Sequence, residues 1–181
     1  MTAPPGYKGH LSIWSRNVRH IDKIDRLIEG LAILIVDENP YMRRLTRMML
    51  LNIGVKLVYE AGDGAAALDV IRNTNPDVAI IDWDLPVLSG PQVVKIVRSP
   101  EVFPKPHLPI IMLTGFAQRW RVQEALRLGV HEFLLKPTSP AALRARLLSI
   151  LTKPRAMVRI GQLYVPEPRR LSGTNDAMWA A

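Results

Sequence analysis

The sequence predicts a doubly wound α/β domain, in which helices cover both faces of a five-stranded parallel sheet. From residue 32 onward, short apolar runs alternate five times with longer segments of helical periodicity. This alternation is typical of parallel strands joined by helical crossovers. Several of the runs, such as AILIV and VAII, are continuously apolar, as expected of strands that are buried on both faces. A chain of 181 residues is long enough for one such domain with flanking segments.

Five strand and helix pairs follow one another along the chain, and the sequence contains no internal repeat. The first joins AILIV (32–36) to a helix that begins at the Asn39 cap and Pro40 and stops at Gly54. The later strands are VKLVYEA (55–61), DVAIID (77–82), LPIIMLTG (108–115) and HEFLLKP (131–137), and their helices are GAAALDVIRNTNP (64–76), SGPQVVKIVRSP (89–100), AQRWRVQEALRLGV (117–130) and SPAALRARLLSILTK (139–153). The Pro-containing connection at 98–109 is predicted to be an extended surface loop.

Two flanking segments divide the chain into residues 1–30, 31–151 and 152–181. Within the first, the spacing of apolar residues predicts an amphipathic helix over residues 15–29, whose charges mix signs. We expect it to pack on its own domain or to pair two chains as a homodimer, rather than to contact a membrane. The last segment contains at most one short strand pattern and continues as a basic, Pro-containing tail that is predicted to be mobile. In the predicted helix at 15–29, the apolar positions are Val18, Ile21, Ile24, Leu27 and Ile28.

Composition narrows the classes of function. The net charge of +8 is spread along the chain, so a nucleic-acid-binding surface is not expected. The sequence has no uninterrupted apolar run of about 18 residues and no secretory signal pattern, so we expect a cytoplasmic protein without membrane insertion. The absence of cysteine excludes disulfides, thiolate metal sites and a cysteine nucleophile.

Polar residues follow the apolar runs at the carboxyl ends of four predicted strands. Right-handed crossovers bring these ends to one edge of the sheet, where ligands bind in such folds. Clustered carboxylates repel one another, and a magnesium ion would neutralise them, because it prefers a few carboxylates and retained waters. The residues are Asp37 and Glu38 after the first strand, Asp82 and Asp84 at the third, Thr114 at the fourth and Lys136 at the fifth.

This group of residues suits phosphoryl chemistry. A carboxylate beside magnesium is a plausible nucleophile toward phosphorus, because the metal offsets the charge of the phosphoryl oxygens. Lys136 would supply a second cation and Thr114 a hydrogen-bond donor to a phosphoryl oxygen. The four histidines are scattered and do not suggest a zinc site.

Five motifs in order resemble the receiver domains of two-component response regulators over residues 31–151. They are ILIVDENP, EAGDGAAAL, IIDWDLPVLSG, IIMLTG and EFLLKP, each at the end of the appropriate strand. In the third motif, Pro follows the first aspartate by four residues and Gly by eight, as in that family. The resemblance implies a flavodoxin-like sheet with strand order 2-1-3-4-5.

The resemblance also implies roles for the edge residues. Asp82 would be the phosphoacceptor and would take its phosphoryl group from a histidine kinase or a phosphotransfer protein. Asp37 would bind Mg2+ directly, Glu38 through water, and Asp84 through its main-chain carbonyl, with Asp82 as a further ligand. Lys136 would pair with the phosphoryl group, and its peptide bond to Pro137 is expected to be cis. Such a protein catalyses only its own phosphorylation and dephosphorylation.

The response to phosphorylation would involve two further side-chain movements. The resemblance implies that Thr114 would move toward the phosphoryl oxygen. It also implies that Phe133 occupies the position at which the family has an aromatic switch that turns inward. A purely structural role for Phe133, as a half-buried aromatic residue of a strand, explains its presence almost equally well. Asp84 and Phe116 occupy positions that modulate phosphoryl lifetime, so we expect that lifetime to differ from the common pattern. With only 30 residues after the predicted domain at 31–151, the expected output is contact with a downstream protein.

Two alternatives remain open on the sequence. IIDWD also resembles the Asp-x-Asp motif of haloacid-dehalogenase-type phosphatases, in which Asp82 would be the nucleophile and Asp84 the general acid and base. The acidic pair on an earlier strand and the position of the motif on the third strand weigh against that reading. The second alternative is a receiver-like binding module that is not phosphorylated, against which stands the presence of every chemical residue.

Overall fold

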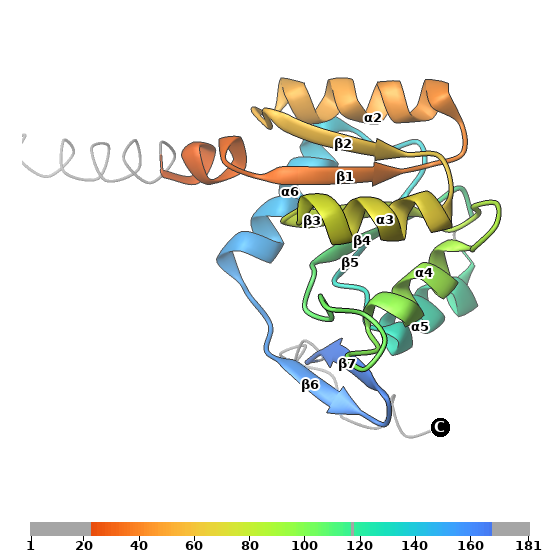
Figure 1. The fold of residues 1–181 in the computed structure, drawn as a ribbon. Coiled ribbons are helices and arrows are strands. Elements are labelled where there is room, and N and C mark those ends of the chain that lie inside the picture. The colour runs from red at the N-terminus through yellow and green to blue at the C-terminus, as the bar shows by residue number, and fades with distance from the viewer. Residues whose placement is uncertain (1–22, 117, 168–181) are drawn as a thin grey trace, which may run out of the picture.

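The computed structural model describes residues 23–116 and 118–167, and it contains the predicted five-stranded parallel sheet (Figure 1). The strand order is β2-β1-β3-β4-β5, with every neighbouring pair parallel. The predicted fold class and strand order are therefore confirmed. The strands are β1 (Ala32–Val36), β2 (Leu57–Ala61), β3 (Val78–Asp82), β4 (Ile110–Thr114) and β5 (Glu132–Leu135).

Each strand is followed by a helix whose ends match local signals in the sequence. The Asn39 side chain accepts hydrogen bonds from the backbone N–H groups of Tyr41 and Met42, as predicted for a helix cap. Ser89 and Gln92 form a capping box. The helices are α2 (Pro40–Asn52), α3 (Gly64–Thr74), α4 (Gly90–Val97), α5 (Arg119–Leu128) and α6 (Pro140–Thr152). In the part of the chain that the structure describes, no helix is long and apolar enough to span a membrane.

The strands divide their side chains between two hydrophobic cores. Successive residues of β1 alternate between them, so Leu34 faces the core under α3, α4 and α5, while Ile33 and Ile35 face the core under α2 and α6. This alternation follows from the two-residue period of a strand. Every residue of β3 and β4 is buried, as expected of the central strands of a sheet covered on both sides.

The described part of the N-terminal helix, residues 23–29, packs on its own domain. Ile28 is fully buried in the core under α2 and α6, and Ile24 packs against the same cluster. Ion pairs join Asp25 to Arg144 at 2.7 Å and Glu29 to Lys56 at 2.8 Å. Of the two roles expected for this helix, packing on its own domain holds for these residues. The rest of the predicted helix, including Val18 and Ile21, lies outside the described residues.

A β-hairpin follows α6, where the sequence predicted at most one short strand. Strands β6 (Met157–Ile160) and β7 (Leu163–Pro166) are antiparallel, and the hairpin lies below α4 and α5 in Figure 1. The prediction failed because β6 and β7 are only four residues each, too short for a clear period-two pattern. The rest of the predicted mobile tail, from residue 168 onward, lies outside the described residues.

The connection at 98–109 is not the extended surface loop that was predicted, because parts of it are buried. Arg98 and Phe103 are almost completely buried. The Arg98 side chain donates hydrogen bonds to the backbone carbonyls of Gly129, Pro106 and Leu108. Its own carbonyl accepts a hydrogen bond from the N–H of Tyr164 in β7. Arg98 therefore links α4, the loop before β4, the turn before β5 and the hairpin.

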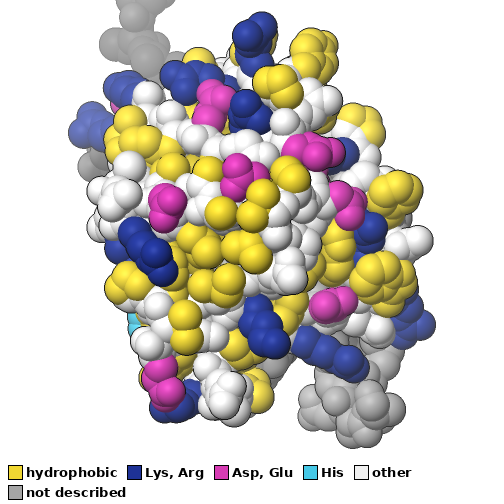
Figure 2. Space-filling model, turned by 45° about the vertical axis from the view of Figure 1, so that its right-hand side comes forward, with side chains coloured by type: hydrophobic (Ala, Val, Ile, Leu, Met, Phe, Trp, Pro, Cys, Tyr) yellow, Lys and Arg dark blue, Asp and Glu magenta, His cyan; other side chains and the backbone are white. Residues whose placement is uncertain are grey.

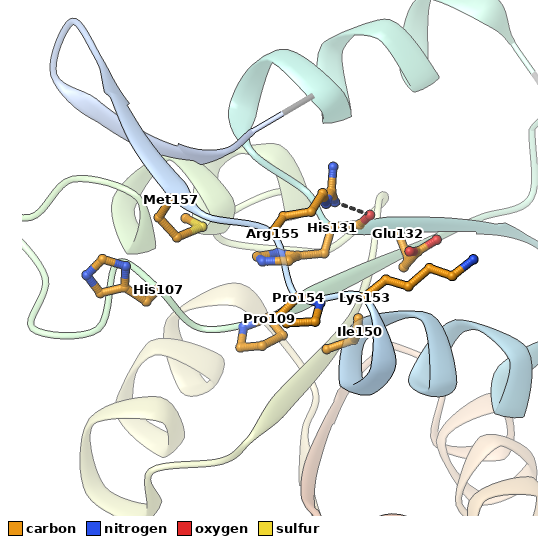
Figure 3. A pocket seen from close by; sticks show the side chains of 9 residues that line it. All are labelled: His107, Pro109, His131, Glu132, Ile150, Lys153, Pro154, Arg155 and Met157. Atoms are coloured by element: carbon orange, nitrogen blue, oxygen red, sulfur yellow. Dashed lines mark hydrogen bonds between the residues drawn. The ribbon is translucent and has the colours of Figure 1, made fainter. Parts of the chain in front are cut away.

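A cavity of about 190 Å³ lies where the hairpin connection meets the amino ends of β4 and β5 (Figure 3). Pro109 and His131, which immediately precede those strands, line it together with Arg155 from the connection and Met157 at the start of β6. Arg155 donates a hydrogen bond to the carbonyl of His131 across this region. The cavity is at the opposite end of the strands from the polar residues predicted to form a site.

Candidate functional site at the carboxyl edge of the sheet

The fold brings the carboxyl ends of the central strands to one edge, and the predicted residues lie there. Asp82 is the last residue of β3 and Thr114 the last of β4, while Asp37 and Lys136 follow β1 and β5 directly. The β3–β4 pairing sets Asp82 opposite Leu113, and the β4–β5 pairing sets Thr114 opposite Leu135. Because each side chain sits at a strand end, rigid backbone fixes its position.

Lys136 joins the two buried aspartates. Its ammonium nitrogen lies 2.5 Å from Asp37 Oδ2 and 2.7 Å from Asp82 Oδ2. Only 4% of the Asp37 side chain and 11% of the Asp82 side chain are exposed. The peptide bond between Lys136 and Pro137 is cis, as expected. Two carboxylates and one ammonium therefore share a largely desolvated site, whose formal charge is negative.

Backbone groups orient the remaining carboxylate oxygens. Asp37 Oδ1 accepts a hydrogen bond from the N–H of Asn39, and Asp82 Oδ1 accepts one from the N–H of Trp83. In each carboxylate, one oxygen thus accepts a hydrogen bond from a backbone N–H and the other accepts one from Lys136. Charge-assisted bonds of this kind hold a carboxylate in one orientation.

The pKa values report the balance between burial and charge at this site. Burial raises the pKa of Asp82 above its usual 3.8, and the negative charge on Asp37 raises it further, against the lowering effects of Lys136 and the Trp83 N–H. Burial lowers the pKa of Lys136, but its hydrogen bonds to both aspartates and their negative charge outweigh that effect and raise it. The site therefore holds its lysine positively charged and favours added positive charge near Asp82.

The close packing at position 90 explains why a glycine follows Asp82 by eight residues. A Cβ at position 90 would lie 2.2 Å from the backbone oxygen of Asp82 and 3.1 Å from the Cα of Trp83. The Gly90 N–H also donates to the carbonyl of Trp83. The first residue of α4 therefore packs directly against the end of β3, and a side chain has no room there.

An arginine that sequence reasoning missed lies beside Thr114. Nη1 of Arg121, in the first turn of α5, is 2.8 Å from Asp84 Oδ2 and 3.1 Å from Thr114 Oγ1. Its guanidinium also contacts the rings of Trp83, Phe116 and Trp120. The sequence pattern predicts only a helix here, because an arginine in a helical pattern gives no signal of a hydroxyl partner outside the helix.

A match to a known protein family decides the family of this chain. The family model described as response regulator receiver domain matches residues 33–148, well over half of the chain. This range contains every predicted site residue. The chain belongs to the response regulator receiver family. This receiver is therefore a phosphorylation-dependent signalling switch of the two-component type.

Curated relatives and solved structures agree with the family match. Chemotaxis protein CheY-3 of Vibrio cholerae is 33% identical over 127 residues, which cover 70% of this receiver and 96% of the relative. Chemotaxis protein CheY of Pseudomonas aeruginosa is 32% identical over 123 residues, covering 68% and 98%. A putative response regulator from Chloroflexus aurantiacus has a TM-score of 0.62 at 31% identity, covering 68% of this receiver and 98% of that chain. The alternative fold of a haloacid-dehalogenase-type phosphatase finds no support in these matches.

Two predicted residues of the receiver lie apart from the central contacts. Glu38 is exposed, and its backbone carbonyl accepts a hydrogen bond from Arg43. Phe133 is half-buried on β5 and packs against the core under α3, α4 and α5.

Among the described residues, no three histidine, aspartate or glutamate side chains are grouped tightly enough to hold a metal by themselves.

Proposed function

We propose that Asp82 is the phosphoacceptor of this receiver and that a histidine kinase or a phosphotransfer protein supplies its phosphoryl group. The observation that carries the proposal is the single ammonium of Lys136 bound to both Asp37 and Asp82 at the carboxyl edge of the sheet. A buried carboxylate with one oriented oxygen near a fixed cation is well placed to attack an incoming phosphorus atom.

The transfer step forms one bond and breaks one. An oxygen of the Asp82 carboxylate attacks the phosphorus of a phosphohistidine, and the P–N bond breaks with its electron pair staying on the ring nitrogen. The product is an acyl phosphate on Asp82 and a neutral histidine, once the ring has taken up a proton. Lys136 offsets the charge of the phosphoryl oxygens, as expected from its raised pKa.

The donor set fits a magnesium ion that keeps several of its waters. Asp37 and Asp82 are two buried carboxylates with only one ammonium between them, so the site carries excess negative charge. Asp37 and Asp82 would bind Mg2+ directly, together with the main-chain carbonyl of Asp84, and Glu38 would contribute through water. Bound magnesium supplies charge neutralisation of the transferring phosphoryl oxygens.

Signal output would pass through Thr114 and Phe133. We infer that Thr114 moves toward the phosphoryl oxygen and that Phe133 turns inward, which changes the surface formed by α5, β5 and α6. A downstream protein would read that surface. On the side of the receiver seen in Figure 2, the basic side chains of the described residues are interspersed with acidic and hydrophobic ones, so these residues form no continuous basic surface for nucleic acid there.

Incubation with Mg2+ and acetyl phosphate tests the proposal. We expect the intact mass to rise by one phosphoryl group per chain, with a base-labile and acid-stable linkage. The variant Asp82→Asn should gain no mass, because an amide oxygen is a much poorer nucleophile. A protein without any mass gain would instead be a receiver-like binding module. Repeated turnover of a simple phosphate ester that Asp84→Asn abolishes would contradict the proposal in favour of a phosphatase.

A further inference from the structure

Arg121 connects three parts of the site, namely the start of α5, the loop after β3 and the end of β4. It lies in the first turn of α5, and its Nη1 donates to Asp84 beyond β3 and to Thr114 at the end of β4. The Arg121 side chain is 13% exposed, and Thr114 is completely buried. One guanidinium nitrogen therefore ties the start of α5 to the hydroxyl expected to respond to phosphorylation.

Three aromatic rings hold this guanidinium in place. Its central carbon lies 5.1 Å from the ring centre of Trp83, 5.0 Å from Phe116 and 5.4 Å from Trp120. The two tryptophan rings pack edge to face, with centres 5.6 Å apart. Cation–π contacts of this kind strengthen when the cation is desolvated. The rings therefore favour one position of the guanidinium.

One buried hydrogen-bond donor of Arg121, its Nε, has no partner within the described residues. A buried donor without a partner carries a free-energy penalty. The bonds of Nη1 to Asp84 and Thr114 and the ring contacts offset this penalty in the observed arrangement.

The contacts of Thr114 define the state of its hydroxyl. Oγ1 accepts one hydrogen bond from Arg121 Nη1 at 3.1 Å and a second from the N–H of Phe116 at 3.2 Å. A hydroxyl oxygen accepts two hydrogen bonds, so its acceptor capacity is filled on the side of α5. Movement of Thr114 toward a phosphoryl group would have to break the bond to Arg121.

The geometry points to Arg121 as a positioning residue that holds Thr114, and with it the start of α5, in the unphosphorylated arrangement. This inference rests on the proposed function, because a phosphoryl group on Asp82 is what draws Thr114 away. Loading of Asp82 then releases the guanidinium from Thr114, and the aromatic contacts with Trp83 and Trp120 transmit that release to α5. Neither the sequence motifs nor the family match assigns a role to this residue.

Binding of beryllofluoride, a phosphoryl analogue, in saturating Mg2+ tests the inference by calorimetry. We expect Arg121→Met to bind the analogue about fivefold or more tightly, because a hydrogen bond from a charged donor no longer opposes the movement of Thr114. The matched control is Arg119→Met, which removes the same charge from an exposed position on the same turn. Measurement at an ionic strength of about 0.5 M limits the direct effect of the lost charge.

The effect must pass through Thr114. In a Thr114→Val background, which lacks the hydroxyl, Arg121→Met should change the affinity by less than about twofold, since no bond remains to be broken. Weaker or unchanged binding in Arg121→Met alone, or an equal gain in the Thr114→Val background, would overturn the inference. Failure of the unmodified protein to bind beryllofluoride at Asp82 would instead contradict the proposed function.

A measurement on the unloaded protein keeps the two proposals separate. The Phe116 N–H donates to Thr114 Oγ1, so its hydrogen exchange reports on the position of that hydroxyl. We expect exchange of this amide to quicken about threefold or more in Arg121→Met and to stay unchanged in Arg119→Met. Unchanged exchange in both variants would contradict a positioning role for Arg121, whatever Asp82 binds.

Discussion

At the residue scale, Gly90 shows how a motif position can be set by packing rather than by chemistry. In the first position of a helix, alanine would normally be preferred over glycine by up to about 1 kcal/mol. At position 90, however, a Cβ would meet the backbone oxygen of Asp82 at 2.2 Å, and backbone atoms cannot move aside as a flexible side chain can. The contact therefore forces either α4 or the end of β3 to shift.

We expect Gly90→Ala to lower the free energy of unfolding by at least about 2 kcal/mol, because overpacking against backbone outweighs the gain in helix propensity. Urea denaturation followed by circular dichroism measures this change. Gly115→Ala is the matched control, since a Cβ there would meet nothing within 4 Å, and its effect should stay within about 0.5 kcal/mol. Equal effects of the two substitutions would show that the contact at Asp82 is not the cause.

At the scale of elements, Arg98 attaches the C-terminal hairpin to the α/β domain. Three backbone carbonyls surround its guanidinium at 2.7–2.9 Å, and no carboxylate is among its recorded partners in the described part of the chain. Burial, assisted by the positive charge of Arg155, lowers the pKa of Arg98 to about 9, so the guanidinium remains charged at neutral pH. The loop carbonyls thus take the place of an acidic partner.

Substitution of Arg98 by methionine keeps most of the aliphatic volume and removes all the donors. We expect Arg98→Met to destabilise the protein by about 2–4 kcal/mol, because three buried carbonyls lose their partner. Hydrogen exchange at the Tyr164 amide, which donates to the Arg98 carbonyl, should quicken more than exchange in β3. Lys95→Met, an exposed position on the same helix, serves as the control and should leave both quantities unchanged.

Elements with strong local signals could be predicted closely from the sequence. The strand at 32–36 was predicted to the residue, because a continuous apolar run is bounded by charge at Asp37. The Asn39 cap and Pro40 fixed the start of α2. The hairpin and the burial of Arg98 could not be predicted, since both depend on contacts between segments that carry no pattern of their own. Long-range partners of this kind appear only once the fold is known.

The same distinction applies to the site. Asp37, Asp82, Thr114 and Lys136 could be predicted to share an edge, because parallel strands direct their carboxyl ends to one side. Their hydrogen-bond partners could not, and Arg121 is the clearest case, since its link to Thr114 crosses from a helix surface to a strand end. Topology therefore predicts which strand ends meet, whereas packing decides which helix side chains join them.

At the scale of the whole molecule, the burial of Asp82 makes the stability of the fold depend on pH. Two carboxylates are buried beside one ammonium, and burial is the largest influence on Asp82, whose pKa is raised above 3.8. A group whose folded-state pKa is raised favours folding while it is protonated. As the pH rises from below the unfolded-state pKa to above the folded-state pKa, this advantage is lost, and ionised Asp82 destabilises the native state at neutral pH.

Asp82→Asn should therefore raise the free energy of unfolding at pH 7 by about 1–2 kcal/mol, because the amide carries no charge and can still accept a hydrogen bond from Lys136. The gain over the unmodified protein should shrink as the pH falls through the raised pKa of Asp82 and nearly vanish below its usual value of 3.8. Thermal denaturation between pH 3.5 and 7 measures it, with the exposed Asp69→Asn as the control that should show no gain. A gain that did not depend on pH would mean that the lost charge is not its source, whereas a loss of stability would mean that the Lys136 pairing outweighs the cost of burial.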